Sequence, residues 1–122
     1  MTQKEGHFRH FLRSCKYSIF GLAIAYTEIA IRQLLLLNIV LCILLCCLDF
    51  DFTVKMILLT AGIMTLVVEL INTAIEAAVD HTSLEHHHLA KRAKDTSSAA
   101  QMVMLILLTA LWGMAVYHRY FI

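Results

Sequence analysis

Three long apolar runs limit this chain to a small number of folds. They cover residues 34–48, 56–68 and 99–117, and Asn38 is the only polar residue of the first run. A helix needs about 20 residues to cross the hydrocarbon core of a bilayer, and three spans cannot close a barrel. The sequence therefore predicts an all-α integral membrane protein, a single domain over residues 1–122, with membrane helices at about 29–48, 53–80 and 92–117.

The composition supports a membrane protein and excludes other classes. Apolar residues make up 60% of the chain and charged residues 16%, against about 45–50% and about 25% in soluble domains. A chain this apolar is not disordered, and a formal charge of +1 argues against a nucleic-acid-binding protein. We interpret the four cysteines as small apolar packing residues: Cys15, Cys42, Cys46 and Cys47.

The basic residues predict how the chain is oriented in the membrane. Eight of the ten Lys and Arg residues precede the first span or lie between the second and the third, and only Lys55 and Arg119 lie on the other side. Cytoplasmic loops are enriched in Lys and Arg. We therefore expect the N-terminus to lie in the cytoplasm.

Residues 1–28 have the period of an amphipathic helix. Apolar side chains from Phe8 to Leu22 fall on one stripe at about 100° per residue, and Arg9, Arg13 and Lys16 lie off it. This pattern predicts a helix on the membrane surface. The same periodicity is also compatible with a simple anchor.

The second span continues into a polar face. Glu69, Asn72, Glu76 and Asp80 fall within about 60° of one another around a helix. Carboxylates on a membrane helix cost several kcal/mol unless they are paired or face a polar cavity. We therefore expect a metal, a Lys or Arg partner or a proton at this face. The alternative is a helical extension that simply projects into water.

Lys94 is the predicted counterpart of these acids. The spacing places it on one face of the third helix with Ser98, Gln101 and Trp112. A lysine and several carboxylates near the membrane surface suit a phosphate and its Mg²⁺. The two basic residues before Lys94 are explained by the orientation of the chain alone.

Two further features could bind a metal. Glu28 is either an interfacial acid or, together with Glu76, one half of a two-carboxylate Mg²⁺ site. The run His86-His87-His88 looks like a metal cluster, but adjacent histidines point apart on a helix and zinc spacing is absent. A solvated loop is the better interpretation for at least two of these histidines.

Three motifs together have the pattern of a known family. They are Glu69-x-x-Asn72-Thr73-Ala74-Ile75-Glu76-x-x-x-Asp80; Ala93-Lys94-Asp95 with Ser98-Ala99-Ala100; and Tyr17-Ser18, Gly21-Leu22, Glu28 and Arg32-Gln33. In these motifs, over nearly its whole length, the chain resembles the prokaryotic membrane diacylglycerol kinases. The resemblance implies a homotrimer in the bacterial cytoplasmic (inner) membrane, with three transmembrane helices and one amphipathic surface helix per subunit. It further implies transfer of the ATP γ-phosphoryl group to a lipid hydroxyl, at active sites between subunits.

The resemblance also implies roles for individual residues. Glu69 would be the general base, supported by Asn72, and Mg²⁺ would be held by Glu28 and Glu76. The residues expected to bind ATP are Arg9 (or His10 in its place), Tyr17, Glu28, Glu76, Glu85, His86, His87, Lys94 and Asp95. The residues expected to contact the lipid are Ala30, Ile31, Arg32, Gln33, Leu34, Lys55, Glu69, Ser98 and Trp112.

Two departures from the family pattern bear on the lipid substrate. Leu34 stands where many diacylglycerol kinases have an acid, and Lys91 replaces a common glycine, as it often does in the undecaprenol kinase branch. Arg32-Gln33 favours diacylglycerol, so we expect phosphatidic acid as the product and keep undecaprenol as the alternative substrate. Two other classes are a small regulatory membrane protein and a cation-coupled transporter, the latter weakened because the charges gather at one end of the helices.

Overall fold

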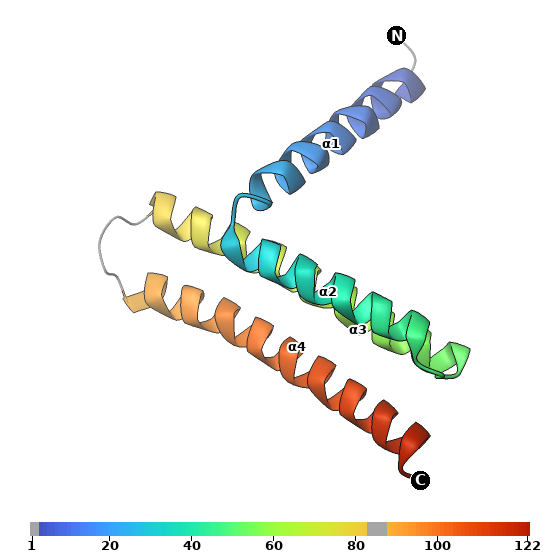
Figure 1. Cartoon of the computed structure of the whole chain (residues 1–122). Helices are drawn as coiled ribbons and strands as arrows, with labels where there is room; N and C mark the ends of the chain where they lie inside the picture. Colours follow the sequence, from blue (N-terminus) through green and yellow to red (C-terminus); the bar gives the residue numbers. More distant parts are fainter. Residues whose placement is uncertain (1–2, 83–87) are drawn as a thin grey trace.

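The computed structural model describes residues 3–82 and 88–122, and nearly all of them are helical (Figure 1). α1 covers Gln3–Ala25, α2 Ile29–Cys47, α3 Phe52–Thr82 and α4 His88–Tyr120. The last three helices are long and apolar enough to cross a membrane, which confirms the three predicted spans. α4 begins earlier than predicted because no glycine or proline interrupts residues 88–98.

The chain turns sharply between α1 and α2. The backbone N–H groups of Thr27 and Glu28 donate to Ile24 and Ala25 at 3.0 and 2.9 Å, and Glu28 itself is extended, with φ −79° and ψ 133°. α1 therefore leaves the other helices at a steep angle (Figure 1). Its described side chains are exposed apart from Ala25. The turn places Glu28 at the corner between α1 and the first span.

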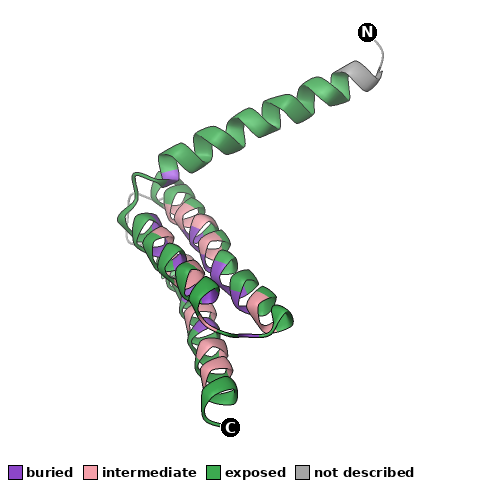
Figure 2. Cartoon of the chain, turned by 45° about the vertical axis from the view of Figure 1, so that its right-hand side comes forward, coloured by how far each residue is buried: buried purple, intermediate pink, exposed green. Residues whose placement is uncertain are grey.

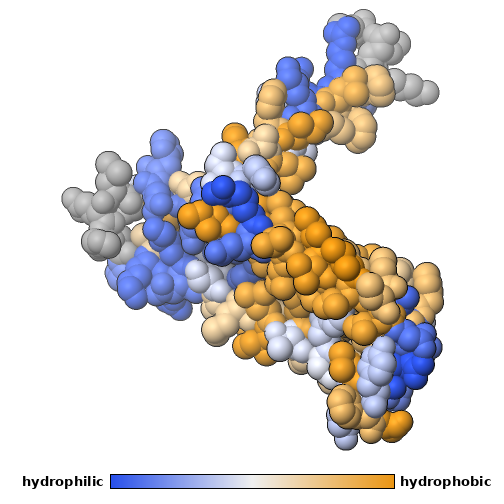
Figure 3. Space-filling view, in the orientation of Figure 1, coloured by the Kyte–Doolittle hydropathy of each residue, from blue (hydrophilic) through white to orange (hydrophobic). Residues whose placement is uncertain are grey.

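α3 is the centre of the three-helix bundle and packs against both α2 and α4. A small buried cluster contains Leu45, Phe50 and Leu58, and many other apolar residues of the spans are exposed, as the colours of Figure 2 show. The space-filling view shows this apolar surface over the middle of the bundle, with polar residues towards its ends (Figure 3). Such a surface suits contact with lipid or with other membrane helices. The four cysteines are free, and Cys42 is the half-buried one.

A polar cluster ties α2 to α3 inside the apolar region. Asn38 Nδ2 donates to the Leu34 carbonyl at 2.9 Å and to Thr65 Oγ1 at 3.4 Å. Thr65 is fully buried and donates its hydroxyl to the Gly62 carbonyl at 2.6 Å. Gly62 permits this approach, because a Cβ at its position would lie 2.6 Å from Asn38 Oδ1. Hydrogen bonds of this kind help membrane helices to associate, since no hydrophobic force acts between helices in lipid.

A second set of contacts closes the end of the bundle that lies opposite the α1 corner. Arg119 pairs with the Asp49 carboxylate and donates Nε–H to the Asp49 carbonyl at 2.7 Å, and the Asp49 N–H donates to the Tyr120 hydroxyl at 3.1 Å. Phe50 packs edge-on against Trp112 and Tyr120, with ring centroids 6.0 and 6.3 Å apart. The hydrogen bond and the charge of Arg119 lower the pKa of Asp49. These contacts hold the α2–α3 connection against the end of α4.

We expect Gly62→Ala to lower the thermal stability of the protein, by about the 1–3 kcal/mol typical of overpacking. The added methyl group would displace the Asn38 amide and break its bond to Thr65. In an Asn38→Ala background the same substitution should be neutral or stabilising, because the space is then open and alanine is favoured over glycine in a helix by about 1 kcal/mol. Thermal unfolding of the four proteins in one detergent measures this coupling. Equal effects in both backgrounds would contradict the predicted contact.

Candidate active site

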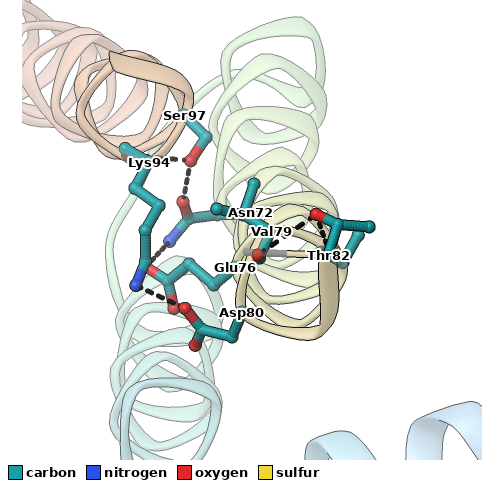
Figure 4. A network of polar contacts seen from close by, with 8 residues as sticks. Asn72, Glu76, Val79, Asp80, Thr82, Lys94 and Ser97 are labelled. Carbon is teal, nitrogen blue, oxygen red and sulfur yellow. Dashed lines mark hydrogen bonds and ion pairs between the residues drawn. The ribbon is translucent and has the colours of Figure 1, made fainter. Parts of the chain in front are cut away.

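The second half of α3 carries four polar residues on the side that faces α4, and Figure 4 shows Asn72, Glu76 and Asp80 among them. Glu69 and Asn72 are buried, with 8% and 7% of their surface exposed. Glu76 is half-buried and Asp80 is exposed. These four residues form an acidic face of α3. It begins inside the bundle and reaches solvent at the end of the bundle where α1 is attached.

Side chains of α4 form hydrogen bonds with the two buried residues of this face, Glu69 and Asn72. Gln101 Nε2 donates to Glu69 Oε2 at 3.2 Å, and the Ser97 hydroxyl donates to Asn72 Oδ1 at 2.6 Å. Asn72 Nδ2 in turn donates to Glu76 Oε1 at 3.4 Å. Buried polar groups are stable only when they are hydrogen-bonded, so these bonds explain how an acid and an amide can lie inside an apolar bundle.

Lys94 brings a positive charge to the outer part of the same face. Its ammonium group binds Asp80 Oδ1 at 2.7 Å, and Figure 4 shows the side chain reaching across from α4 towards Asp80 and Glu76. The two paired side chains are 40% and 65% exposed. An exposed ion pair contributes little to stability, so Lys94 can exchange Asp80 for a phosphate at small cost.

The neighbouring charges of α4 lie elsewhere. Lys91 pairs with Asp95 at 2.9 Å along the helix, and both side chains are more than half exposed. Arg92 is also exposed. Lys94 therefore pairs across to α3 whereas Lys91 pairs along α4, and Asp95 is not brought to the acidic face in this structure.

One part of the predicted α4 face is wrong. Ser97 rather than Ser98 faces α3, because the rotation of α4 against α3 turns Ser97 towards Asn72. Ser97 is 8% exposed, whereas Ser98 is exposed on the surface of the chain. The spacing in the sequence does not distinguish the two serines, because each lies three or four residues from both Lys94 and Gln101.

Glu28 lies beside a different face of α3. It lines a groove of about 580 Å³ between the end of α1 and residues of α3 that include Thr73, Ala74 and Ala77. These three residues lie about 60–160° around α3 from Glu76. Among the described residues, no three His, Cys, Asp or Glu side chains gather as a metal site.

The remaining candidate residues are spread over the chain. Arg9 and Tyr17 are exposed on α1, while Glu85, His86 and His87 lie outside the described residues. Of the residues expected to contact lipid, Ile31 and Leu34 are buried within the chain, Lys55 and Trp112 are half-buried, and Ala30, Arg32, Gln33 and Ser98 are exposed.

The fold and the site together define a multi-pass membrane protein with an acidic face that leads from the bundle interior to one end of the bundle. The chain matches the model of the prokaryotic diacylglycerol kinase family over residues 16–116. It is 43% identical to a diacylglycerol kinase of Pseudomonas aeruginosa over 86% of each chain. It is 32% identical to the diacylglycerol kinase of Escherichia coli K12, over 98% of this chain and 99% of that one. The chain therefore belongs to the prokaryotic diacylglycerol kinase family, as the sequence motifs predict.

We expect Ser97→Ala to lower the melting temperature of the protein more than Ser98→Ala does. Removing the Ser97 hydroxyl leaves the buried Asn72 Oδ1 without its donor, and an unsatisfied buried group costs about 1–3 kcal/mol. Ser98 is exposed and serves as the matched control. Thermal unfolding in the same detergent compares the two variants, and equal shifts would show that Ser97 contributes no more than a surface serine.

Proposed function

We propose that this protein is an ATP-dependent diacylglycerol kinase that transfers the γ-phosphoryl group to the primary hydroxyl of diacylglycerol and forms phosphatidic acid. The observation that carries the proposal is the acidic face of α3, with Glu69 buried at its inner end and Lys94 beside Glu76 and Asp80 at its outer end. A lipid hydroxyl and a water-soluble nucleotide can both reach such a face. Family membership supports the same reaction.

The residues of the face suit the separate requirements of phosphoryl transfer. This reaction depends on positioning and on neutralising charge more than on covalent chemistry by the protein. Glu69 would accept the proton of the lipid hydroxyl as general base. Asn72 is bonded to both Ser97 and Glu76 and would keep the face in place, while Lys94 would bind the phosphates of ATP.

Mg²⁺ is the cofactor that these side chains would accommodate. It prefers oxygen ligands and is often bound through one or two carboxylates together with the phosphates of a nucleotide. Glu76 is half-buried beside Lys94, and Glu28 stands at the corner between α1 and α2 at the same end of the bundle. These two carboxylates would hold the ion, which would neutralise charge on the phosphates.

A homotrimer would bring the dispersed residues together. Within one chain, α1 carries Arg9 and Tyr17 away from the acidic face (Figure 1). The spans also expose much of their apolar surface. We propose that α1 lies as an amphipathic helix on the cytoplasmic surface of the inner membrane, and that each active site contains side chains from two subunits. The concentration of Lys and Arg at the α1 end of the bundle supports this orientation.

An assay of the purified protein tests the reaction. With labelled ATP and Mg²⁺ we expect diacylglycerol to be phosphorylated in preference to undecaprenol, and chelation of Mg²⁺ to stop the reaction. Glu69→Gln should lower the rate by about 10²–10⁴-fold, the usual contribution of a positioned general base, while leaving ATP binding unchanged. Preference for undecaprenol would change the assigned substrate, and a near-normal rate in the variant would exclude Glu69 as the base.

Three substitutions on α4 test the role of Lys94. We expect Lys94→Met to lower turnover by about 10²–10³-fold, the scale for one electrostatic donor to a developing charge. Lys91→Met and Arg92→Met should have small effects, because Lys91 is paired with Asp95 and both residues are exposed. All three substitutions remove one positive charge from the same segment, so the comparison controls for orientation in the membrane. Equal losses of rate in one detergent would contradict a phosphate-binding role for Lys94.

A further inference from the structure

Gln101 is a buried polar residue within the apolar part of α4. Only 7% of its surface is exposed, and it lies between Ala100 and Met102 in the third apolar run. Polar side chains at such positions are rare, because each must find a hydrogen-bond partner inside the protein. The roles assigned above to the acids and to Lys94 do not account for it.

The amide nitrogen of Gln101 faces two acceptors on α3. Nε2 donates to the Thr65 carbonyl at 3.0 Å and to Glu69 Oε2 at 3.2 Å. A carbonyl and a carboxylate can only accept hydrogen bonds. The opposite orientation of the amide would therefore place its oxygen against two acceptors, so this arrangement is the one that the chemistry requires.

The amide oxygen of Gln101 shows that packing does not explain the residue. Oε1 is buried, and within the described ranges 3–82 and 88–122 no donor binds it. A buried acceptor without a partner destabilises a protein. A methionine would fill nearly the same space without this penalty, so the gain from the amide comes from its N–H groups.

The contacts of Thr65 make its carbonyl a fixed point for Gln101. Thr65 has no exposed surface, and its hydroxyl donates to the Gly62 carbonyl and accepts a bond from Asn38. The carbonyl therefore lies where α2, α3 and α4 are joined. Gln101 is held at this carbonyl by one N–H group and reaches Glu69 with the other.

We propose that Gln101 is a positioning residue for the transfer reaction, which holds one oxygen of the Glu69 carboxylate so that the other oxygen meets the lipid hydroxyl. The inference rests on the proposed kinase function. As the lipid oxygen forms its bond to the γ-phosphorus, its proton passes to Oε1 of Glu69. The bond between the γ-phosphorus and the bridging oxygen breaks, and the electron pair leaves with ADP.

Kinetics of Gln101→Met test this role. We expect kcat to fall by about 10–100-fold, the scale of a small misplacement of a reacting group, and KM for ATP and for diacylglycerol to stay within about twofold. In a Glu69→Gln background the same substitution should have no further effect, because Gln101 acts through Glu69. Independent, multiplicative losses in the double variant would overturn the proposal, and so would a raised KM with unchanged kcat.

A matched control separates positioning from support of the bundle. Leu58→Ala removes buried packing from the cluster with Leu45 and Phe50, away from Glu69, Thr65 and Gln101. We expect it to lower the melting temperature but to leave kcat within about twofold.

If Gln101→Met does not fold, Gln101→Asn keeps the amide on a shorter side chain and should show the same loss of kcat. Wild-type protein that phosphorylates no lipid would refute the kinase function, whereas an active wild type with a normal Gln101→Met variant would refute only the role of Gln101.

Discussion

Hydrogen bonds between polar side chains of α3 and α4 are the constraint on which the rest of this structure depends. In lipid, apolar helices gain little by leaving their surroundings for one another, so packing and polar contacts must hold a bundle together. Here Gln101 binds Thr65 and Glu69, and Ser97 binds Asn72. The same bonds that join the two helices also determine where the Glu69 carboxylate lies. Stability of the bundle and geometry of the candidate site are therefore coupled.

The candidate site also offers different environments along one helix to the two substrates of a reaction between a lipid and a nucleotide. Exposure rises along α3 from the buried Glu69 to the exposed Asp80. The inner end suits a hydroxyl that arrives from the bilayer, and the outer end, with Lys94, suits phosphates that arrive from water. The corner at Glu28 lies at the same end, whereas the contacts of Asp49 and Arg119 close the opposite end. The charged residues of the candidate site therefore lie at the end of the bundle where a lipid kinase would bind the phosphates of its nucleotide.

Much of this arrangement could be predicted from the sequence, and particular residues show why the rest could not. Apolar runs and the 3.6-residue period predict the spans and the shared face of Glu69, Asn72, Glu76 and Asp80. They do not predict that Asn38 meets Gly62, or that Ser97 and not Ser98 faces Asn72. The first contact depends on how α2 packs against α3, and the second on the rotation of α4.

The sequence by itself determined the number of spans, the face on which the acids lie and the family to which the chain belongs, because these depend on composition, period and motif. Only the tertiary structure decided which α4 residues meet that face, and that Glu28 lines a groove against other residues of α3 than Glu76. The physical reason is that periodicity orders residues around a helix's own axis. Periodicity does not determine how one helix is rotated, or shifted along its axis, relative to another. Here the packing at Gly62 and the hydrogen bonds of Thr65 and Gln101 determine both.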